Sequence, residues 1–215
     1  MSLTTEQDGD SSGDGGWLCL DFANTIGSRV NEDSVDKLAG YQELVAWSIE
    51  KGALTPDDAE RLNQEAFQRP AEAEVVFHRA IDLREAIYRI FAAAADGRPP
   101  RMGDLPILNA AIALAQTRRQ LVYTPAGFQW VWIPEQDRLD PMLWPVALSA
   151  GELLTSARLS RVKECANDTC SWLFVDMSRN RSRRWCDMSD CGNRAKARRH
   201  YHRQHDAQSS GDGEG

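Results

Sequence analysis

The chain has 215 residues, a hydrophobic share of 42% and a net charge of −7 at neutral pH, as expected for a globular protein of one medium and one small domain. No apolar run approaches the roughly 20 residues that span a bilayer, and the acidic, Gly/Ser-rich residues 1–16 are the reverse of a signal peptide. We therefore expect no membrane association and a cytoplasmic location, where clustered cysteines more often bind metals than form disulfides.

The net charge hides two opposite regions. Residues 158–205 contain 12 Lys/Arg and 5 Asp/Glu, a net charge of +7, whereas the rest of the chain contains 13 and 27, a net charge of −14. A basic C-terminal module attached to an acidic body points to a polyanionic partner for the module.

The N-terminal elements begin after a tail. Residues 1–16 are predicted to be disordered because they are poor in apolar side chains. The apolar run from Trp17 to Phe22 then predicts a short buried strand that closes at the turn-prone Asn24.

Five helices are predicted in the body from apolar residues that recur at three and four positions. They cover residues 33–52, 54–67, 71–97, 104–119 and 140–156. Thr55 is expected to cap the second helix, and Asp104 and Asp140 the last two. Between these two, residues 120–133 alternate about a Pro/Gly turn and predict a β-hairpin.

The C-terminal module contains two short strand candidates, residues 161–165 and 172–176, followed by a helix that starts just after Cys191. The predicted fold class is therefore α+β. A mostly helical body with a small antiparallel sheet covers residues 17–157. A small ribbon or treble-clef-like domain covers residues 160–205, and residues 206–215 form a second disordered tail.

Four of the five cysteines lie within 27 positions, as Cys165-x4-Cys170 and Cys186-x4-Cys191 with fifteen residues between the pairs. Two close pairs can offer a zinc ion four thiolates at about 2.3 Å. Since the module has few apolar residues, one structural zinc ion would hold it together, at roughly 10–16 kcal/mol of apparent binding free energy. A dithiol redox pair or an iron–sulfur cluster usually has closer spacing.

A resemblance follows from these residues. RSRRWCDMSDCGNRAKARRHYHR closely resembles the CGNR zinc-finger family, whose hallmark is a Trp-Cys pair followed by Cys-Gly-Asn-Arg, here Trp185, Cys186 and 191–194. LCLDFANT, residues 18–25, resembles the opening of the ABATE domain, the usual partner of this finger in bacterial proteins. Members are described as stress-induced transcription regulators. The resemblance thus implies a DNA-binding regulator.

The basic residues of the module suit phosphates, because arginine combines charge with bidentate geometry and a helix N-terminus offers unpaired amides. The candidate nucleic-acid contacts are Arg181, Arg183, Arg184, Arg194, Lys196, Arg198, Arg199 and Arg203. DNA is favoured over RNA mainly through the resemblance. RNA binding, a protein–protein adaptor with an acidic partner and a merely solvated basic face are the alternatives.

Two residues of the CGNR motif have more local expectations. Asn193 is expected to cap the basic helix rather than to contact a base, because Asn directly after Gly is common at a helix start. Gly192 is expected to adopt a positive φ in the turn beside Cys191.

The body is expected to sense a small-molecule effector or to form a homodimer. Asp21, Asn24 and Thr25 are candidate ligand-binding residues, because polar groups at strand ends often bind ligands; a turn with a helix cap is the more ordinary explanation. The sequence contains no Gly-rich phosphate loop, Ser-based nucleophile elbow or histidine–carboxylate metal motif, so we expect no enzymatic activity.

Overall fold

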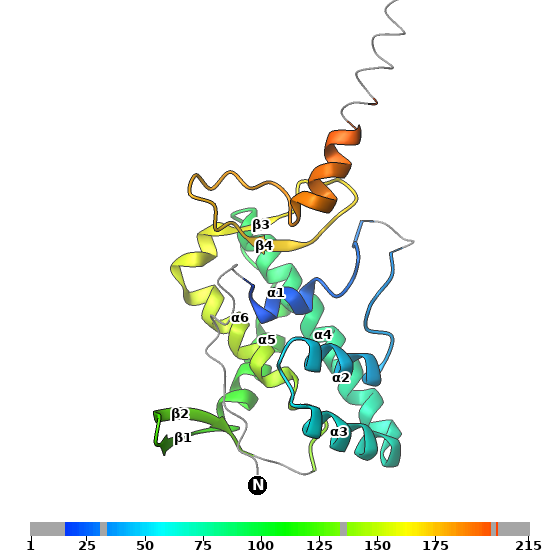
Figure 1. The fold of residues 1–215 in the computed structure, drawn as a ribbon, viewed down its shortest axis with the longest axis vertical. Coiled ribbons are helices and arrows are strands. Elements are labelled where there is room, and N and C mark those ends of the chain that lie inside the picture. The colour runs from blue at the N-terminus through cyan, green and yellow to red at the C-terminus, as the bar shows by residue number, and fades with distance from the viewer. Residues whose placement is uncertain (1–15, 31–33, 134–136, 199–200, 202–215) are drawn as a thin grey trace, which may run out of the picture.

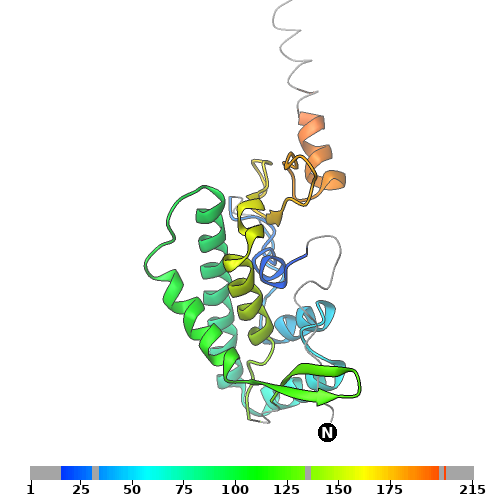
Figure 2. The same cartoon turned by 90° about the vertical axis from the view of Figure 1, so that its left-hand side faces the viewer.

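A computed structural model describes residues 16–30, 34–133, 137–198 and 201. A helical body carries the cysteine-containing segment at one end, and the β-hairpin of the body projects at the opposite end (Figure 1). The perpendicular view shows the same arrangement, with the C-terminal helix pointing away from the body (Figure 2).

The elements follow one another in a simple order. The body contains α1 (Leu18–Ala23), α2 (Tyr41–Glu50), α3 (Pro56–Gln68), α4 (Pro70–Ala95), α5 (Asp104–Gln116), β1 (Arg119–Thr124), β2 (Gly127–Trp132) and α6 (Leu143–Thr155). The C-terminal segment contains the 3-10 turn η1 (Ala157–Arg161), β3 (Val162–Glu164), β4 (Leu173–Val175) and the π-helical turn η2 (Met188–Gly192). The predicted α+β class, a mostly helical body with a small antiparallel sheet, is confirmed.

Helix α4 is the central element of the body. It contacts each of the other body helices and the strands of the C-terminal segment. Its buried face contains Val76, Ala80, Leu83, Ile87 and Phe91, as the sequence periodicity predicts. No helix in the described ranges has both the length and the apolar character needed to cross a lipid bilayer.

The first element is a helix, so the prediction of a strand at residues 17–22 was wrong. Cys19, Leu20, Phe22 and Ala23 are all buried within α1, which contacts α4, α6 and β4. A short apolar run that is buried on several sides has no period, and periodicity alone cannot distinguish a strand from a helix there.

Helix α2 begins at Tyr41, eight residues later than predicted. The preceding segment is held in another conformation by tertiary contacts. Asp36 forms an isolated antiparallel bridge with Ile26, and both of its carboxylate oxygens accept hydrogen bonds from Arg84, at 2.7 and 2.8 Å. These interactions with distant residues outweigh the local helical pattern.

The predicted helix caps are correct at Thr55 and wrong at Asp104 and Asp140. Thr55 accepts a hydrogen bond from the Asp58 amide at 3.2 Å. In contrast, the buried carboxylates of Asp104 and Asp140 accept hydrogen bonds from Arg89 and Arg138, respectively. A guanidinium gives each buried carboxylate charge-assisted hydrogen bonds, so these two aspartates bind arginine and do not cap a helix.

The predicted hairpin is present as the antiparallel pair β1–β2. Gly127 has a φ of 108° at its turn, a value that favours glycine. The cross-strand pairs place four large apolar side chains on one face, and all four are exposed: Leu121 opposite Trp130, and Tyr123 opposite Phe128. This hairpin therefore presents an apolar surface to solvent.

The C-terminal segment shares the main core of the body. Strands β3 and β4 pair antiparallel as a short ribbon, with Val162 opposite Val175 and Glu164 opposite Leu173. Val162, Leu173 and Val175 are buried in the same apolar cluster as α1, α4 and α6. The ribbon is thus covered by the body, whereas the C-terminal helix extends away from it (Figure 1).

Candidate metal centre

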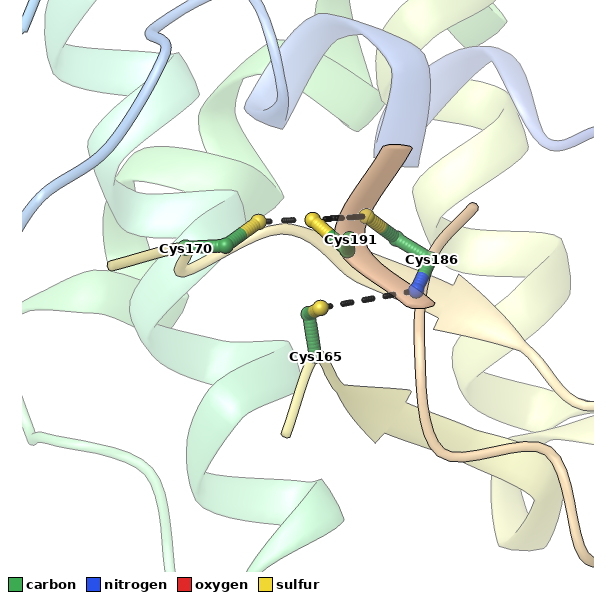
Figure 3. A group of neighbouring side chains, drawn as sticks. All are labelled: Cys165, Cys170, Cys186 and Cys191. Atoms are coloured by element: carbon green, nitrogen blue, oxygen red, sulfur yellow. Dashed lines mark hydrogen bonds between the residues drawn. The ribbon is translucent and has the colours of Figure 1, made fainter. Parts of the chain in front are cut away.

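Two structural units bring the four cysteines together. Cys165 directly follows β3 and Cys170 shortly precedes β4, so both lie in the loop that joins the two strands of the ribbon. Cys186 precedes the turn that opens the C-terminal helix, and Cys191 lies within that turn. The side chains from these two units point toward one another (Figure 3).

The sulfur geometry fits a tetrahedral metal ion. All four Sγ atoms lie within 4.8 Å of one another. The Sγ atom of Cys186 is 3.8 Å from that of Cys170 and 3.7 Å from that of Cys191. A zinc–sulfur bond of about 2.3 Å implies a tetrahedron edge of about 3.8 Å. The cluster therefore has the spacing that zinc requires.

The protonation of the thiols leads to the same conclusion. Hydrogen bonding from Cys186 lowers the pKa of Cys170 to about 5. The pKa of Cys186 is raised, chiefly through the same bond to the Cys170 thiolate, and burial raises the pKa of Cys191. Without a cation the cluster thus favours one thiolate among thiols, because close negative charges repel one another. A divalent cation would stabilise all four thiolates.

Backbone bonds and aromatic rings fix the first pair of cysteines. The amide of Cys165 donates to the Trp172 carbonyl at 2.8 Å, which closes the ribbon, and the amide of Cys170 donates to the Asn167 carbonyl at 2.8 Å. Trp172 and Trp185 pack against the cysteine cluster. The sulfurs therefore have defined positions that are set by the surrounding protein.

The helix after the second pair begins earlier than predicted. Asp187, rather than Asn193, is its cap: its carboxylate accepts hydrogen bonds from the amides of Ser189 and Asp190 at 2.6 and 3.0 Å. A π-helical turn, Met188–Gly192, precedes the α-helical residues 193–198. The side chain of Asn193 instead donates to the Ser189 carbonyl at 2.8 Å.

The prediction of a positive φ at Gly192 was also wrong. Gly192 lies within the helical turn, and positive φ values occur at other glycines of the described chain. A Cβ atom at this position would lie 3.1 Å from the Met188 sulfur and 3.8 Å from the Asp187 carbonyl. Glycine therefore fits because the turn is tightly packed.

Three of the arginines predicted to contact nucleic acid bind within the module. Arg194 donates to the Cys191 sulfur at 3.3 Å and to Asp190 at 2.7 Å. Arg198 binds Asn167 and Asp168 of the first cysteine loop. Arg183 donates to the carbonyls of Trp185 and Cys186. Arg198 thus connects the two cysteine pairs, and Arg183 and Arg194 hold the segment of the second pair. Motif spacing could not distinguish these roles from phosphate binding.

Other basic side chains remain accessible. Arg179, Arg181, Arg184 and Lys196 are exposed and form no ion pair with the described residues. The guanidinium of Arg184 lies 5.5 Å from the Trp185 ring centre. Arg181 has a left-handed φ of 50°, a strain of order 1 kcal/mol that the surrounding contacts must hold. Arg199 and Arg203 lie outside the described residues.

Asp176 organises the loop that carries Arg179, Arg181 and Arg184. The sequence analysis did not identify this aspartate. Its fully buried carboxylate accepts hydrogen bonds from Lys163 at 2.6 Å, from the amide of Ser178 at 2.9 Å and from that of Arg183 at 3.0 Å. Burial would raise the pKa of Asp176, but the Lys163 ammonium and the Ser178 donors hold it well below its usual range. An aspartate directly after a buried strand was the available signal.

The three candidate ligand-binding residues of the body have protein partners. The Asn24 side chain donates to the Leu173 carbonyl at 2.8 Å and accepts from the Leu173 amide at 2.9 Å. The Thr25 hydroxyl donates to the Phe22 carbonyl at 2.8 Å. Asp21 lies 3.6 Å from Lys51. Asn24 therefore extends the ribbon by one backbone-like pair and joins the body to the metal-binding segment.

Comparison with known families agrees with this architecture. Residues 16–157 match the ABATE family, described as "Putative stress-induced transcription regulator", and residues 161–204 match the CGNR zinc finger. No curated protein matches the chain. The zinc-finger match and the sulfur geometry together assign one structural zinc ion to the module.

Proposed function

Because the chain belongs to the ABATE family and carries a CGNR zinc finger, we propose that it is a transcription regulator that binds duplex DNA through the zinc module. In this proposal, residues 17–157 form the regulatory body and residues 160–205 the DNA-binding module. The proposed location is the cytoplasm.

The observation that carries the proposal is the exposed basic surface beside a rigid metal centre. Arg179, Arg181, Arg184 and Lys196 are exposed without ion-pair partners among the described residues, in a segment whose net charge is +7. Arginines with unpaired guanidinium groups bind phosphate oxygens, and the rigid zinc centre fixes their positions. The proposed DNA contacts differ from those expected from the sequence, because Arg183, Arg194 and Arg198 bind groups within the module.

The body contributes regulation in this proposal. Its hairpin exposes the apolar side chains Leu121, Tyr123, Phe128 and Trp130, and exposed apolar patches of this kind often mark association surfaces. The hairpin lies at the end of the body opposite the zinc module, so a homodimer formed there would leave both zinc modules free to bind DNA. Catalysis is not part of the proposal, since four thiolates leave zinc no open position and neither matched family is an enzyme family.

The test is binding of the zinc-loaded protein to labelled random duplex DNA over a series of salt concentrations. We expect log Kd to depend steeply on log salt, and the triple variant Arg179→Gln, Arg181→Gln, Arg184→Gln to lower the magnitude of the slope by up to about three. Arg101→Gln, an exposed charge loss on the body, is the matched control.

Competition separates DNA binding from the alternatives. Unlabelled duplex DNA of unrelated sequence should displace the probe more effectively than single-stranded RNA or a poly-glutamate peptide. Preferential displacement by RNA would favour the RNA-binding alternative. Binding to an acidic protein partner that duplex DNA does not displace would favour the adaptor alternative and contradict the proposal.

A further inference from the structure

A cavity of about 240 Å³ lies at the joint between the body and the zinc module. One wall comes from α1, α2 and the residues beside them and includes Trp17, Trp47 and Lys51. The other comes from β4 and the following loop and includes Phe174 and Arg183. The cavity is smaller than the roughly 300–1,000 Å³ of drug-sized sites. Its size suits a molecule with a single ring.

Aromatic side chains and charged groups of both signs line this cavity. Trp172 also lines it, and the Lys37 ammonium lies 5.6 Å from the centre of the Trp172 ring. Lys37 is exposed and forms no ion pair in the described part of the chain. Lys51 lies between Asp21 and Glu50, at 3.6 Å from each carboxylate. The Arg183 guanidinium, also in the lining, donates to the Trp185 and Cys186 carbonyls. Lys37 therefore carries the positive charge of the lining that has no ion pair or side-chain hydrogen bond among the described residues.

The far wall is connected to the metal centre. Arg183 lies over the Phe174 ring, with its guanidinium carbon 4.8 Å from the ring centre, and it donates to the Cys186 carbonyl. Cys186 itself also lines the cavity. The Arg183 amide donates to Asp176, which orders the loop that bears Arg179 and Arg181. A molecule in the cavity would thus contact the base of the basic loop.

We propose that this cavity is the effector site of the protein and that it binds a small aromatic carboxylate. The ring would lie among the tryptophan side chains, and the carboxylate would bind the Lys37 ammonium. Binding between the two walls would fix the orientation of the loop that contains Arg179, Arg181 and Arg184. The proposal rests on the proposed function for its consequence, a change in DNA affinity, but not for ligand binding itself.

Benzoate is the probe for the binding step, with the zinc-loaded full chain. Three of the seven tryptophans line the cavity, so saturable quenching of tryptophan fluorescence is expected. Lys37→Gln should weaken benzoate binding about tenfold, as expected for loss of one charged hydrogen bond, whereas Arg101→Gln should not change it. Absence of saturable quenching in millimolar benzoate overturns the proposal.

Two analogues test the chemical class. Benzamide keeps the ring and loses the charge, and cyclohexanecarboxylate keeps the charge and loses the aromatic ring. Both should bind at least about tenfold more weakly than benzoate. Equal binding of benzamide would exclude the carboxylate–lysine contact, and equal binding of cyclohexanecarboxylate would exclude the aromatic site. An unchanged benzoate affinity in Lys37→Gln would place any binding elsewhere.

DNA affinity tests the regulatory step separately. Benzoate should change the Kd for duplex DNA at least about threefold in the wild type and leave it unchanged in Lys37→Gln. Benzoate binding with an unchanged DNA affinity would overturn the regulatory role of the cavity. If benzoate binds as predicted while duplex DNA is not bound at all, the proposed function fails and the ligand site stands.

Discussion

The body and the zinc module are stabilised by different forces. The body buries large apolar side chains such as Phe22, Phe91 and Met142 completely, whereas the outer part of the module relies on four sulfurs and charged hydrogen bonds. The ribbon β3–β4 belongs structurally to the body, since Leu173 and Val175 lie in the main core. We therefore expect the part of the zinc module that follows the ribbon to need zinc for folding, and the ribbon itself to fold with the body.

The largest expected effect comes from removing a zinc ligand. Cys186→Ser should abolish zinc binding, because a three-thiolate site loses most of the roughly 10–16 kcal/mol of apparent binding free energy. The helix after Cys191 should unfold while β3–β4 and the body remain folded. Zinc analysis and amide hydrogen exchange measure both effects. The buried thiol Cys19 lies outside the cluster, so Cys19→Ala should retain one zinc; global unfolding of Cys186→Ser would contradict this expectation.

A second variant tests the loop between the ribbon and the second cysteine pair. Asp176→Asn removes the charge partner of Lys163 at a buried site and should destabilise the protein by about 3 kcal/mol. Urea denaturation gives this value. Asp168→Asn, which alters an exposed partner of Arg198, should cost less than about 1 kcal/mol. Comparable losses for the two variants would contradict the assigned role of Asp176.

The same carboxylate predicts a pH dependence. Since folding lowers the pKa of Asp176 below its ordinary value of 3.8, its contribution to stability is complete above that pH. The contribution is lost as the pH falls below about 4 toward the lowered pKa. In Asp176→Asn the decline of the free energy of unfolding between pH 5 and 2 should be shallower than in the wild type (a window of about three units).

The joint between the two regions depends on Asn24. Asn24→Ala removes both hydrogen bonds to Leu173 and leaves the amide and carbonyl of Leu173 without these partners. We therefore expect the free energy of unfolding to fall by about 2–3 kcal/mol. Asn193→Ala removes one exposed hydrogen bond and should cost about 0.5 kcal/mol. Urea denaturation compares the two. If Asn24→Ala costs no more than the control, the joint is held by the apolar contacts of the ribbon alone.

The smallest effect is expected at the outer surface of the metal centre. Arg194→Ala removes the donor to the Cys191 sulfur and should weaken zinc binding about tenfold, the usual effect of losing an outer partner of a metal ligand. Competition with a chelator measures the affinity. Lys196→Ala should leave zinc affinity unchanged, since Lys196 has no partner at the cluster. Equal zinc affinity in wild type and Arg194→Ala would contradict a role for Arg194 at the metal centre and favour phosphate binding instead.

The sequence alone determined the features that depend on local spacing. Two Cys-x4-Cys pairs predicted the metal centre, the periodicity of residues 71–97 predicted the buried face of α4, and the Pro/Gly turn predicted the hairpin. Each signal lies within a few dozen residues of chain. Helix period, strand alternation and metal-ligand spacing are set by local backbone geometry, so such signals can be interpreted without knowledge of the tertiary fold.

Only the tertiary structure decided which partners the polar residues have. Asn24 and Leu173 lie 149 residues apart in the sequence, and nothing near Asn24 indicates that its amide pairs with β4. Arg194 and Arg198 have the composition of phosphate contacts but bind the cysteine loops. Residues 18–23 became helical because the body buries them on several sides. In each case a distant group, brought close by the fold, outweighs the local preference.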